Sequence, residues 1–231
     1  MLKSISGSYT GMRGCQQMLD VVANNLANVN TTAYKERTVS FQELPYRALA
    51  ERRLPLSGGP AAVPLGGKGT VLCSTASSQE GGTPVHTDYE LDLAIEGEGF
   101  FRVIRADGSY AYTRSGNFCP DAEGNIVLPG GERLDMTLGS PKIYRFTNPQ
   151  GLSGLGESLF MPSANSGPPR EGRAGEEGFG SIRQGFLESS NVDMGRQMTM
   201  LIRGQRALQA SARTLTAADE LWGITLQMQS G

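Results

Sequence analysis

The stretch that decides the fold runs from Met194 to Leu226 and reads MGRQMTMLIRGQRALQASARTLTAADELWGITL. Steps of four and three residues alternate along it and define a seam: Met194, Met198, Leu201, Gln205, Leu208, Ala212, Leu215, Asp219, Trp222 and Leu226. A mean spacing of 3.5 residues is typical of a helix that packs along one stripe, as in a coiled coil. Ser190 and Asp193 resemble a capping box, so we expect this helix to begin near Asn191.

The other end of the chain carries a second seam with the same alternation. Its members are Leu2, Ile5, Tyr9, Met12, Gln16, Leu19, Ala23 and Leu26. Asn and Thr residues at 28 and 30–32 favour a turn, so we expect the helix to end near Asn28. No Pro occurs before Pro45 or after Pro169, which leaves both terminal segments free of the strongest helix breaker.

Neither terminal helix is expected to be stable alone. Burial of the few large apolar side chains in the first seam contributes less than the entropy cost of ordering about 25 residues. Gly7, Gly11 and Gly14 weaken that helix further. We therefore expect the two helices to pair antiparallel, and their remaining faces to pack between subunits.

The middle of the chain has the period of β-structure. Residues 101–105 and 110–114 flank an Asp-Gly turn and predict a hairpin. Further turns are indicated at 121–125 and 129–131, and a further short strand at 142–146. Leu91, Leu93 and Ile95 alternate with Asp92, Ala94 and Glu96, which predicts a strand with one solvent-exposed face.

The sequence thus predicts an α+β fold, in which long N- and C-terminal helices pair as a coiled coil and the centre is an all-β body. We expect an N-terminal helix at 1–30, an extended connector at 31–67, a β-rich body at 68–184, and a return segment with the C-terminal helix at 185–231. The 31 Gly and 12 Pro concentrate in turns and in two stretches, 55–69 and 163–180. We interpret both stretches as flexible surface connections.

Composition excludes several classes of protein. The net charge is -2 and no basic cluster exceeds two or three residues, so we expect no nucleic-acid partner. No apolar run reaches eighteen residues, so we expect no membrane insertion. The first residues lack the apolar core of a cleavable signal peptide. Cys15, Cys73 and Cys119 have no metal-binding or redox spacing, and we interpret them as free thiols.

No motif for catalysis survives inspection, and we expect a protein that is not an enzyme and has no cofactor and no metal site. The segment 66–70 has its Lys and Gly in the wrong order for a phosphate loop, and 97–99 lacks the third Gly of a dinucleotide site. The turn at 121–125 has its Gly misplaced for a calcium loop. Asp92 and Glu96 fit a solvated strand face, and His86 fits a surface or strand histidine.

Four stretches resemble the bacterial flagellar basal-body rod proteins, a family of flagellar axial proteins. The most specific is ANNLANVNTTAYK at 23–35; the others are DLAIEGEGFF at 92–101 with YTRSGNF at 112–118, FTNPQGL at 146–152, and GSIRQGFLESSNV at 180–192. They follow the family's order over nearly the whole chain.

The resemblance implies a structural subunit that stacks helically, with its terminal helices around a hollow core and its β-body outside. It implies export through the flagellar type III apparatus, location in the basal body, and partners among copies of itself and other rod and hook proteins. The expected assembly interface comprises the seam residues Leu2, Ile5, Tyr9, Met12, Leu19, Leu26, Met194, Met198, Leu201, Leu208, Leu215, Trp222 and Leu226, with Asn24, Asn25, Asn28, Asn30 and Tyr34. We expect residues 24–34 to fix the junction of helix and body by side-chain to backbone hydrogen bonds.

The chain departs from the family pattern in two places. Only Asp135 to Arg145 separates the strand near Leu134 from the FTNP segment, where distal-rod members usually carry a few tens of residues more. The C-terminal helix has GRQM at 195–198 and RAL at 206–208 in place of the usual acidic residues and Arg-Ala-Tyr run. Distal rod, proximal rod and shortened paralogue all remain open.

Two other functions stay open as alternatives. One is a non-polymerising adaptor or cap that binds a ring protein or peptidoglycan. The other is a cell-wall hydrolase, for which Asp92, Glu96 and His86 are the only candidates.

Overall fold

The computed structural model describes residues 2–44, 47–48, 65–66, 70–137 and 140–230. For residues 2–6, 47–48, 65–66, 137, 140, 226, 229 and 230 it describes the backbone alone. The chain divides into two compact units, each described here by itself. Unit 1 comprises Met1–Asn24, Thr38–Ala76 and Gly195–Gly231, and unit 2 comprises Asn25–Arg37 and Ser77–Met194.

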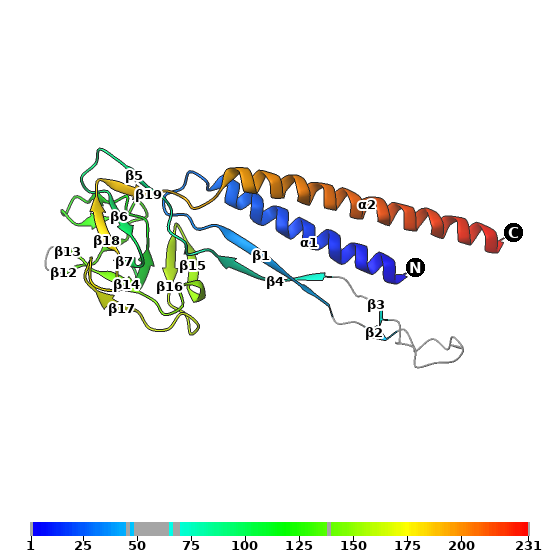
Figure 1. Cartoon of the computed structure of the whole chain (residues 1–231), viewed down its shortest axis with the longest axis horizontal. Helices are drawn as coiled ribbons and strands as arrows, with labels where there is room; N and C mark the ends of the chain where they lie inside the picture. Colours follow the sequence, from blue (N-terminus) through cyan, green and yellow to red (C-terminus); the bar gives the residue numbers. More distant parts are fainter. Residues whose placement is uncertain (1, 45–46, 49–64, 67–69, 138–139, 231) are drawn as a thin grey trace. The chain divides into compact units, whose positions relative to one another are not determined.

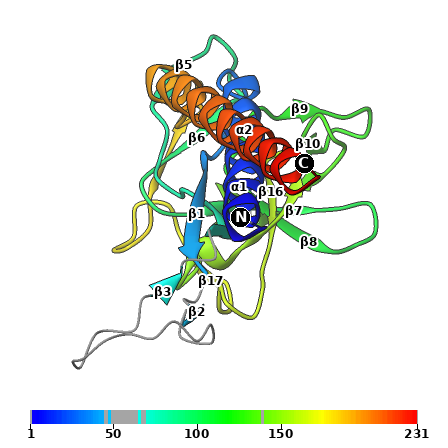
Figure 2. The same ribbon diagram turned by 90° about the vertical axis from the view of Figure 1, so that its right-hand side faces the viewer.

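Two antiparallel helices, α1 (Leu2–Ala27) and α2 (Met194–Ser230), supply the long elements of unit 1. The Ser8 and Thr214 hydroxyl oxygens lie 3.3 Å apart. Gly204 faces Leu19, because a Cβ at Gly204 would come within 2.8 Å of the Leu19 Cδ2 atom. These two contacts fix the register, and Figures 1 and 2 show the helices side by side. The predicted pairing of the terminal helices is confirmed.

A two-stranded ribbon of β1 (Arg37–Glu43) and β4 (Thr70–Ser77) packs on another side of α1. The Ser40 and Ser74 hydroxyl oxygens lie 2.8 Å apart across it. The Phe41 ring fits against Gly14, where a Cβ would stand 3.2 Å from the ring edge. The absence of a side chain at Gly14 therefore lets the strand approach the helix. The remaining strands of unit 1, β2 (Arg47–Ala48) and β3 (Leu65–Gly66), pair with each other.

One helix boundary differs from the prediction. The first helix ends at Ala27, within one residue of the expected position, but α2 begins at Met194, three residues later than Asn191. The Asn191 side chain accepts the Glu36 N–H at 2.6 Å and donates to the carbonyl oxygens of Ser78 and Glu80. These bonds hold Asn191 in the return segment, so the helix begins only after it.

A nine-stranded sheet forms the centre of unit 2. Its main path runs β15 (Ser153–Gly156), β16 (Leu159–Met161), β8 (Tyr110–Thr113), β7 (Phe100–Ile104), β11 (Arg133–Leu134), β10 (Ile126–Val127) and β9 (Cys119–Pro120). The strand β14 (Ile143–Arg145) pairs with β7 and with β17 (Arg170–Gly172). A 3-10 helix spans Pro149–Gly151.

Three antiparallel strand pairs complete unit 2. They are β6 (Leu93–Glu96) with β18 (Ser181–Gln184), β5 (Pro84–His86) with β19 (Phe186–Glu188), and β12 (Met136–Thr137) with β13 (Ser140–Pro141). The first two pairs bring the return segment of the chain back onto strands at the start of the body.

Both faces of the sheet are buried. Phe101 belongs to a core cluster with Ile95, Val103, Ala111, Phe118, Leu128, Leu134, Ile143 and Leu159. Its neighbour Phe100 points to the opposite face and packs with Tyr112, Tyr144, Phe146, Leu152 and Phe160. Successive side chains of a strand point to opposite faces, so consecutive buried Phe residues require cover on both sides. Edge-to-face ring pairs, such as Tyr112 with Phe146 at 4.9 Å, order the second cluster.

The local predictions for the body are confirmed in part. The predicted hairpin is β7–β8, and the turns at 121–125 and 129–131 close β9–β10 and β10–β11. The predicted solvent-exposed face of residues 91–96 is wrong at Ala94, which is buried, and at Asp92, which is 7% exposed. The prediction fails because the strand pair β6–β18 packs into the core and leaves only Glu96 in solvent.

The segment 163–180 is not the flexible connection that its composition suggested. It contains β17, and Ser166, which is fully buried, donates its hydroxyl to the Ser163 carbonyl oxygen at 2.9 Å. The other Gly/Pro-rich stretch, 55–69, lies outside the described residues except for Leu65–Gly66.

The helix register predicts a cross-link. With the native cysteines replaced by Ser, Ser8→Cys with Thr214→Cys should form an intramolecular disulfide under mild oxidation, detected by mass spectrometry of the dilute chain. In the matched control, Thr216→Cys replaces Thr214→Cys, which turns the second thiol about 200° around the helix. Equal yields from the two pairs would contradict the register.

Burial predicts how the body responds to alkaline pH. Desolvation raises the pKa of Tyr144 well above its ordinary value near 10, and raises the pKa values of Tyr112 and Tyr34. The folded chain therefore holds these protons more tightly than the unfolded chain does. The free energy of unfolding should fall as the pH rises from about 10, the pKa in the unfolded chain, through the higher pKa in the folded chain. Tyr144→Phe should make this loss shallower in urea titrations at increasing pH. The exposed control Tyr89→Phe should leave it unchanged; a parent-like slope for Tyr144→Phe would count against this assignment.

Candidate assembly interface

The covered stripe of α2 overlaps the predicted seam in part. Seven residues at alternating steps of four and three are buried or half-buried: Gln197, Leu201, Gly204, Leu208, Ser211, Leu215 and Ala218. Leu201, Leu208 and Leu215 belong to the predicted seam. Met194, Met198 and Trp222 are at least 40% exposed. The small residues Gly204, Ser211 and Ala218, spaced seven apart, alternate with these leucines in the stripe. A seam defined by large apolar residues does not include them.

The first helix is covered on two sides. Gly204 of α2 lies against Leu19, and the β1–β4 ribbon lies against Gly14. The exposed strip between them comprises Tyr9, Arg13, Gln16, Asp20 and Ala23. Met12, Leu19 and Leu26 of the predicted interface are half-buried. For Leu2, Ile5 and Leu226 the side chains lie outside the described atoms. The role of the predicted interface residues in assembly stays a prediction.

The far end of α2 runs beyond the described part of α1. Since Ser8 lies opposite Thr214 and both helices rise 1.5 Å per residue, Leu2 falls opposite about residue 220. Leu221, Trp222, Ile224 and Met228 are 40% to 79% exposed. Soluble monomers rarely gather large exposed apolar side chains on one element, and such groups mark contact surfaces.

The segment 25–37 is fixed by one buried amide. Asn25 is 1% exposed; its Nδ2 donates to the Arg37 carbonyl oxygen at 2.8 Å, and its Oδ1 accepts the Arg37 N–H at 3.0 Å. The Tyr34 hydroxyl donates to the same Oδ1 atom at 3.1 Å. The Asn25 side chain thus joins the last turn of α1 to the first residue of β1. Thr31 donates its hydroxyl to Asn28 at 3.1 Å within the intervening turn, and Asn24 and Asn30 are exposed.

A buried ion cluster of Lys35, Arg114 and Glu188 connects this segment to the body. The side chains of all three are at most 3% exposed. Glu188 Oε1 accepts from Lys35 Nζ at 2.6 Å, from the Gly82 N–H at 2.8 Å and from Arg114 Nη1 at 3.5 Å. Desolvation is the main cause that lowers the pKa of Lys35. Sequence reasoning missed this cluster, because its members are 79 and 74 residues apart in the chain.

Backbone bonds run beside the cluster. The Ala33 N–H donates to the Glu188 carbonyl oxygen at 2.8 Å, and Lys35 Nζ donates to the Glu80 carbonyl oxygen at 2.7 Å. Gly82 approaches so closely that a Cβ there would stand 1.9 Å from the Ser189 carbonyl oxygen. Three distant parts of the sequence, near residues 35, 80 and 188, therefore meet at one buried carboxylate.

The candidate catalytic residues have structural partners. Asp92 Oδ2 accepts the Thr87 hydroxyl at 2.7 Å, Glu96 pairs with Arg183 at 2.6 Å, and His86 packs edge-on against Phe186. Cys15, Cys73 and Cys119 are free thiols, as predicted. In the part of the chain that the structure describes, no three His, Cys, Asp or Glu side chains are arranged to hold a metal ion. Within the same part, no helix has the length and apolar character needed to span a membrane.

Comparison with known proteins identifies the chain. Family models described as flagella basal body rod protein, flagellar hook protein FlgE/F/G D1 domain and flagellar basal body rod FlgEFG protein C-terminal match residues 9–35, 94–153 and 183–228. The flagellar basal-body rod protein FlgG of Borreliella burgdorferi is 33% identical to this chain over 97% of both chains. The chain belongs to the flagellar basal-body rod protein family. Membership of this family places it in the basal body of the bacterial flagellum.

Other relatives agree with this assignment. The FlgG proteins of Caulobacter vibrioides and Bacillus subtilis are each 32% identical, over 99% and 96% of this chain and 100% and 97% of their own. The Borreliella alignment spans 259 positions yet takes in 97% of a 231-residue chain. A few tens of positions in the alignment are therefore gaps in this chain, where the Borreliella protein has residues.

The Asn25 amide gives a stability prediction. Asn25→Ala removes a buried partner from both backbone groups of Arg37 and should lower the free energy of unfolding by about 2–4 kcal/mol in urea titrations. Asn30→Ala, at an exposed position of the same segment, should stay within about 0.5 kcal/mol of the parent. Similar losses for both variants would show that the Asn25 amide has no special role.

The ion cluster gives a second stability prediction. Glu188→Gln leaves Lys35 and Arg114 buried without a carboxylate and should lower the free energy of unfolding by about 3–5 kcal/mol. The control Glu96→Gln removes the carboxylate of the solvent-exposed Arg183 pair and should cost less than about 1 kcal/mol. A Glu188→Gln loss as small as that of the control would contradict the structural importance of the cluster.

Proposed function

We propose that this chain is a structural subunit of the flagellar basal-body rod, which stacks helically into a hollow drive shaft and transmits torque from the motor to the hook. Its neighbours are copies of itself and other rod and hook proteins, and it leaves the cell through the flagellar export apparatus. It has no enzymatic role. The observation that carries the proposal is family membership over nearly the whole chain, combined with exposed apolar side chains along α2.

The terminal helices are proposed to order fully only on assembly. The pair α1–α2 covers one narrow stripe of each helix, and the end of α2 beyond residue 220 has no described α1 residue opposite. Neighbouring subunits supply the missing cover, and the added burial stabilises the helices along the stack. A weakly ordered monomer suits passage through a narrow export channel.

Assembly is tested by changing the exposed end of α2. Ile224→Asp with Met228→Asp should abolish swimming in soft agar and remove the protein from isolated basal bodies, because charges then replace apolar contacts between subunits. The far-UV circular dichroism and melting temperature of the β-body should not change. Gln205→Asp with Gln209→Asp, exposed on the same helix, is the matched control and should preserve swimming. Normal rods in the first variant would refute the assembly role of this surface.

The change Leu201→Asp with Leu208→Asp would be a less specific test of assembly. Both side chains lie in the stripe that α1 covers, so the change breaks the helix pair within one chain as well as any contact between chains. The change at Ile224 and Met228 isolates the contact between chains.

Two further measurements separate the alternatives. Electron microscopy of basal bodies should show repeated copies along the axis, whereas a single layer would favour the adaptor or cap. Circular dichroism of the dilute monomer should show less helix than the structure contains. Full helicity, unchanged on deletion of residues 1–28, would rule out assembly-coupled folding.

A further inference from the structure

The segment 180–192, called here the strap, lies against the first strands of unit 2. Within the strap, β18 pairs with β6 and β19 pairs with β5, although the whole nine-stranded sheet separates these partners in the sequence. Ile182 of the strap, for example, lies opposite Ile95. Figure 1 shows the four strands together in the body. The strap therefore returns the chain to the place where unit 2 begins.

The strap completes the core on one face of the sheet. Ile182 packs against the cluster that contains Phe101, and Ile95 opposite it is buried. Gly180 approaches so closely that a Cβ there would stand 2.7 Å from the Glu96 carbonyl oxygen. Among the described residues β6 has no other strand partner. Without the strap, β6 would be unpaired and this part of the core would face water.

The strap also supplies the carboxylate for two buried cations. Lys35 Nζ donates to the Glu80 carbonyl oxygen at 2.7 Å, and Arg114 Nε donates to the Gly99 carbonyl oxygen at 3.0 Å. Within the part of the chain that the structure describes, Glu188 is the one carboxylate that forms an ion pair with either cation. Two buried cations without this carboxylate would repel each other, which opposes closure of the body.

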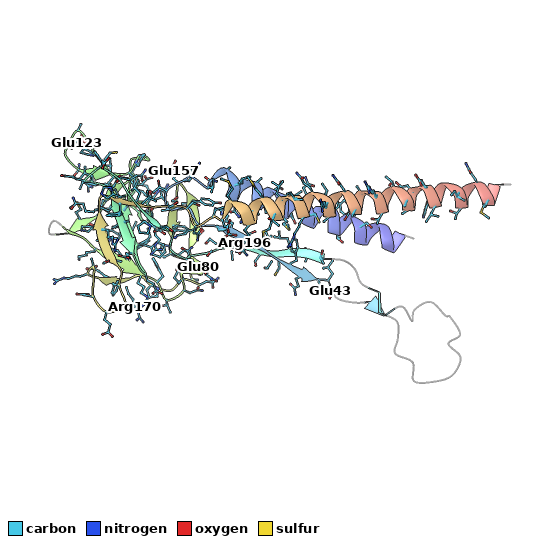
Figure 3. All side chains as sticks on the ribbon, turned by 45° about the horizontal axis from the view of Figure 1, so that its top comes forward. Glu43, Glu80, Glu123, Glu157, Arg170 and Arg196 are labelled. Carbon is cyan, nitrogen blue, oxygen red and sulfur yellow. The ribbon has the colours of Figure 1, made fainter. Side chains whose placement is uncertain are left out.

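Hydrogen bonds attach the strap to the start of unit 2. The Ala33 N–H donates to the Glu188 carbonyl oxygen at 2.8 Å, and the Asn191 Oδ1 accepts the Glu36 N–H at 2.6 Å. The Asn191 side chain also donates to the carbonyl oxygen of Glu80, a residue labelled in Figure 3, at 3.1 Å. The strap is thus the common partner of two segments that precede the sheet.

The strap becomes available late, because it lies in the last quarter of the chain. The groups that bind the Glu188 carboxylate belong to Lys35, Gly82 and Arg114, which precede it by 153, 106 and 74 residues. Contacts over such separations cost loop-closure entropy before they contribute any energy. A growing chain therefore contains the whole nine-stranded sheet before it contains the strap.

We propose that the strap acts as a latch: unit 2 closes in one cooperative step that requires residues 180–192, and the body stays open until they are in place. The sheet and the strand pairs β5–β19 and β6–β18 then open and close together. An open body keeps the growing chain loose enough for export, and this use of the latch rests on the proposed function. The latch itself is a property of the isolated chain.

Hydrogen exchange of the full chain tests the latch, because it measures the free energy of opening strand by strand. Glu188→Gln should speed exchange of the protected amides at least about a hundredfold, by the same factor in β7 and β8 as in β18 and β6. Faster exchange confined to the strap and its partner strands, with β7 and β8 at parent rates, would overturn the proposal. The sheet would then be closed without the strap.

A milder variant keeps the test valid if Glu188→Gln does not fold. Ile182→Ala removes an apolar side chain of the strap without leaving a buried charge, and should speed exchange about tenfold in the strap and in β7 and β8 alike. The matched control Glu96→Gln removes the carboxylate of the exposed pair with Arg183 of the strap. It should change exchange less than about fivefold. Unchanged exchange of β7 and β8 in Ile182→Ala would count against the latch.

Pulse labelling during refolding of the parent chain gives the order of events. Amides of β7, β8 and β18 should become protected in a single phase. Protection of β7 and β8 before β18 would overturn the latch. The proposed function is tested separately by the presence of the chain in basal bodies. A body that closes without the strap would leave that function intact, and absence of the chain from rods would refute the function but not the latch.

Discussion

The carboxylate of Glu188 is the interaction on which the arrangement of unit 2 depends. It receives Lys35 from the segment after α1, Gly82 from the loop before β5 and Arg114 from the end of β8. Charges buried at this depth are stable only when they are paired and hydrogen-bonded, so the three segments must meet or none can be buried. These contacts hold the two ends of the body together without any contribution from the terminal helices.

Contacts between residues far apart in the chain, such as those of Glu188, could not be predicted from the sequence, whereas local features could. The helices, the β7–β8 hairpin and its neighbouring turns depend on residues close in the chain, such as Asp107 and Gly108, and their patterns identify them. The buried Asp92, the ordered segment 163–180 and the Lys35–Glu188 pair depend on contacts between distant residues, which no local period records. The helix α2 begins at Met194 and not near Asn191 for the same reason, because Asn191 is hydrogen-bonded to Glu36 and Ser78.

Two different surfaces share α2, and the sequence pattern did not separate them. A 3.5-residue period identifies a stripe, but it does not distinguish the stripe that a helix buries within its own chain from one left for a neighbour. Large residues dominated the sequence pattern, whereas the contact with α1 uses Gly204, Ser211 and Ala218 between leucines. The small residues bring the helices close, and the exposed Met, Ile and Leu side chains remain outside the pair.

The antiparallel register also decides where this protein can be labelled. Both helix ends near the chain termini, at Leu2 and Ser230, lie toward the same end of the helix pair (Figure 1). A fluorescent or affinity tag fused at either terminus would therefore crowd the same surface. The tight β7–β8 turn at Asp107 and Gly108 is exposed and closed by its own hydrogen bonds. It is the more suitable place for a short epitope.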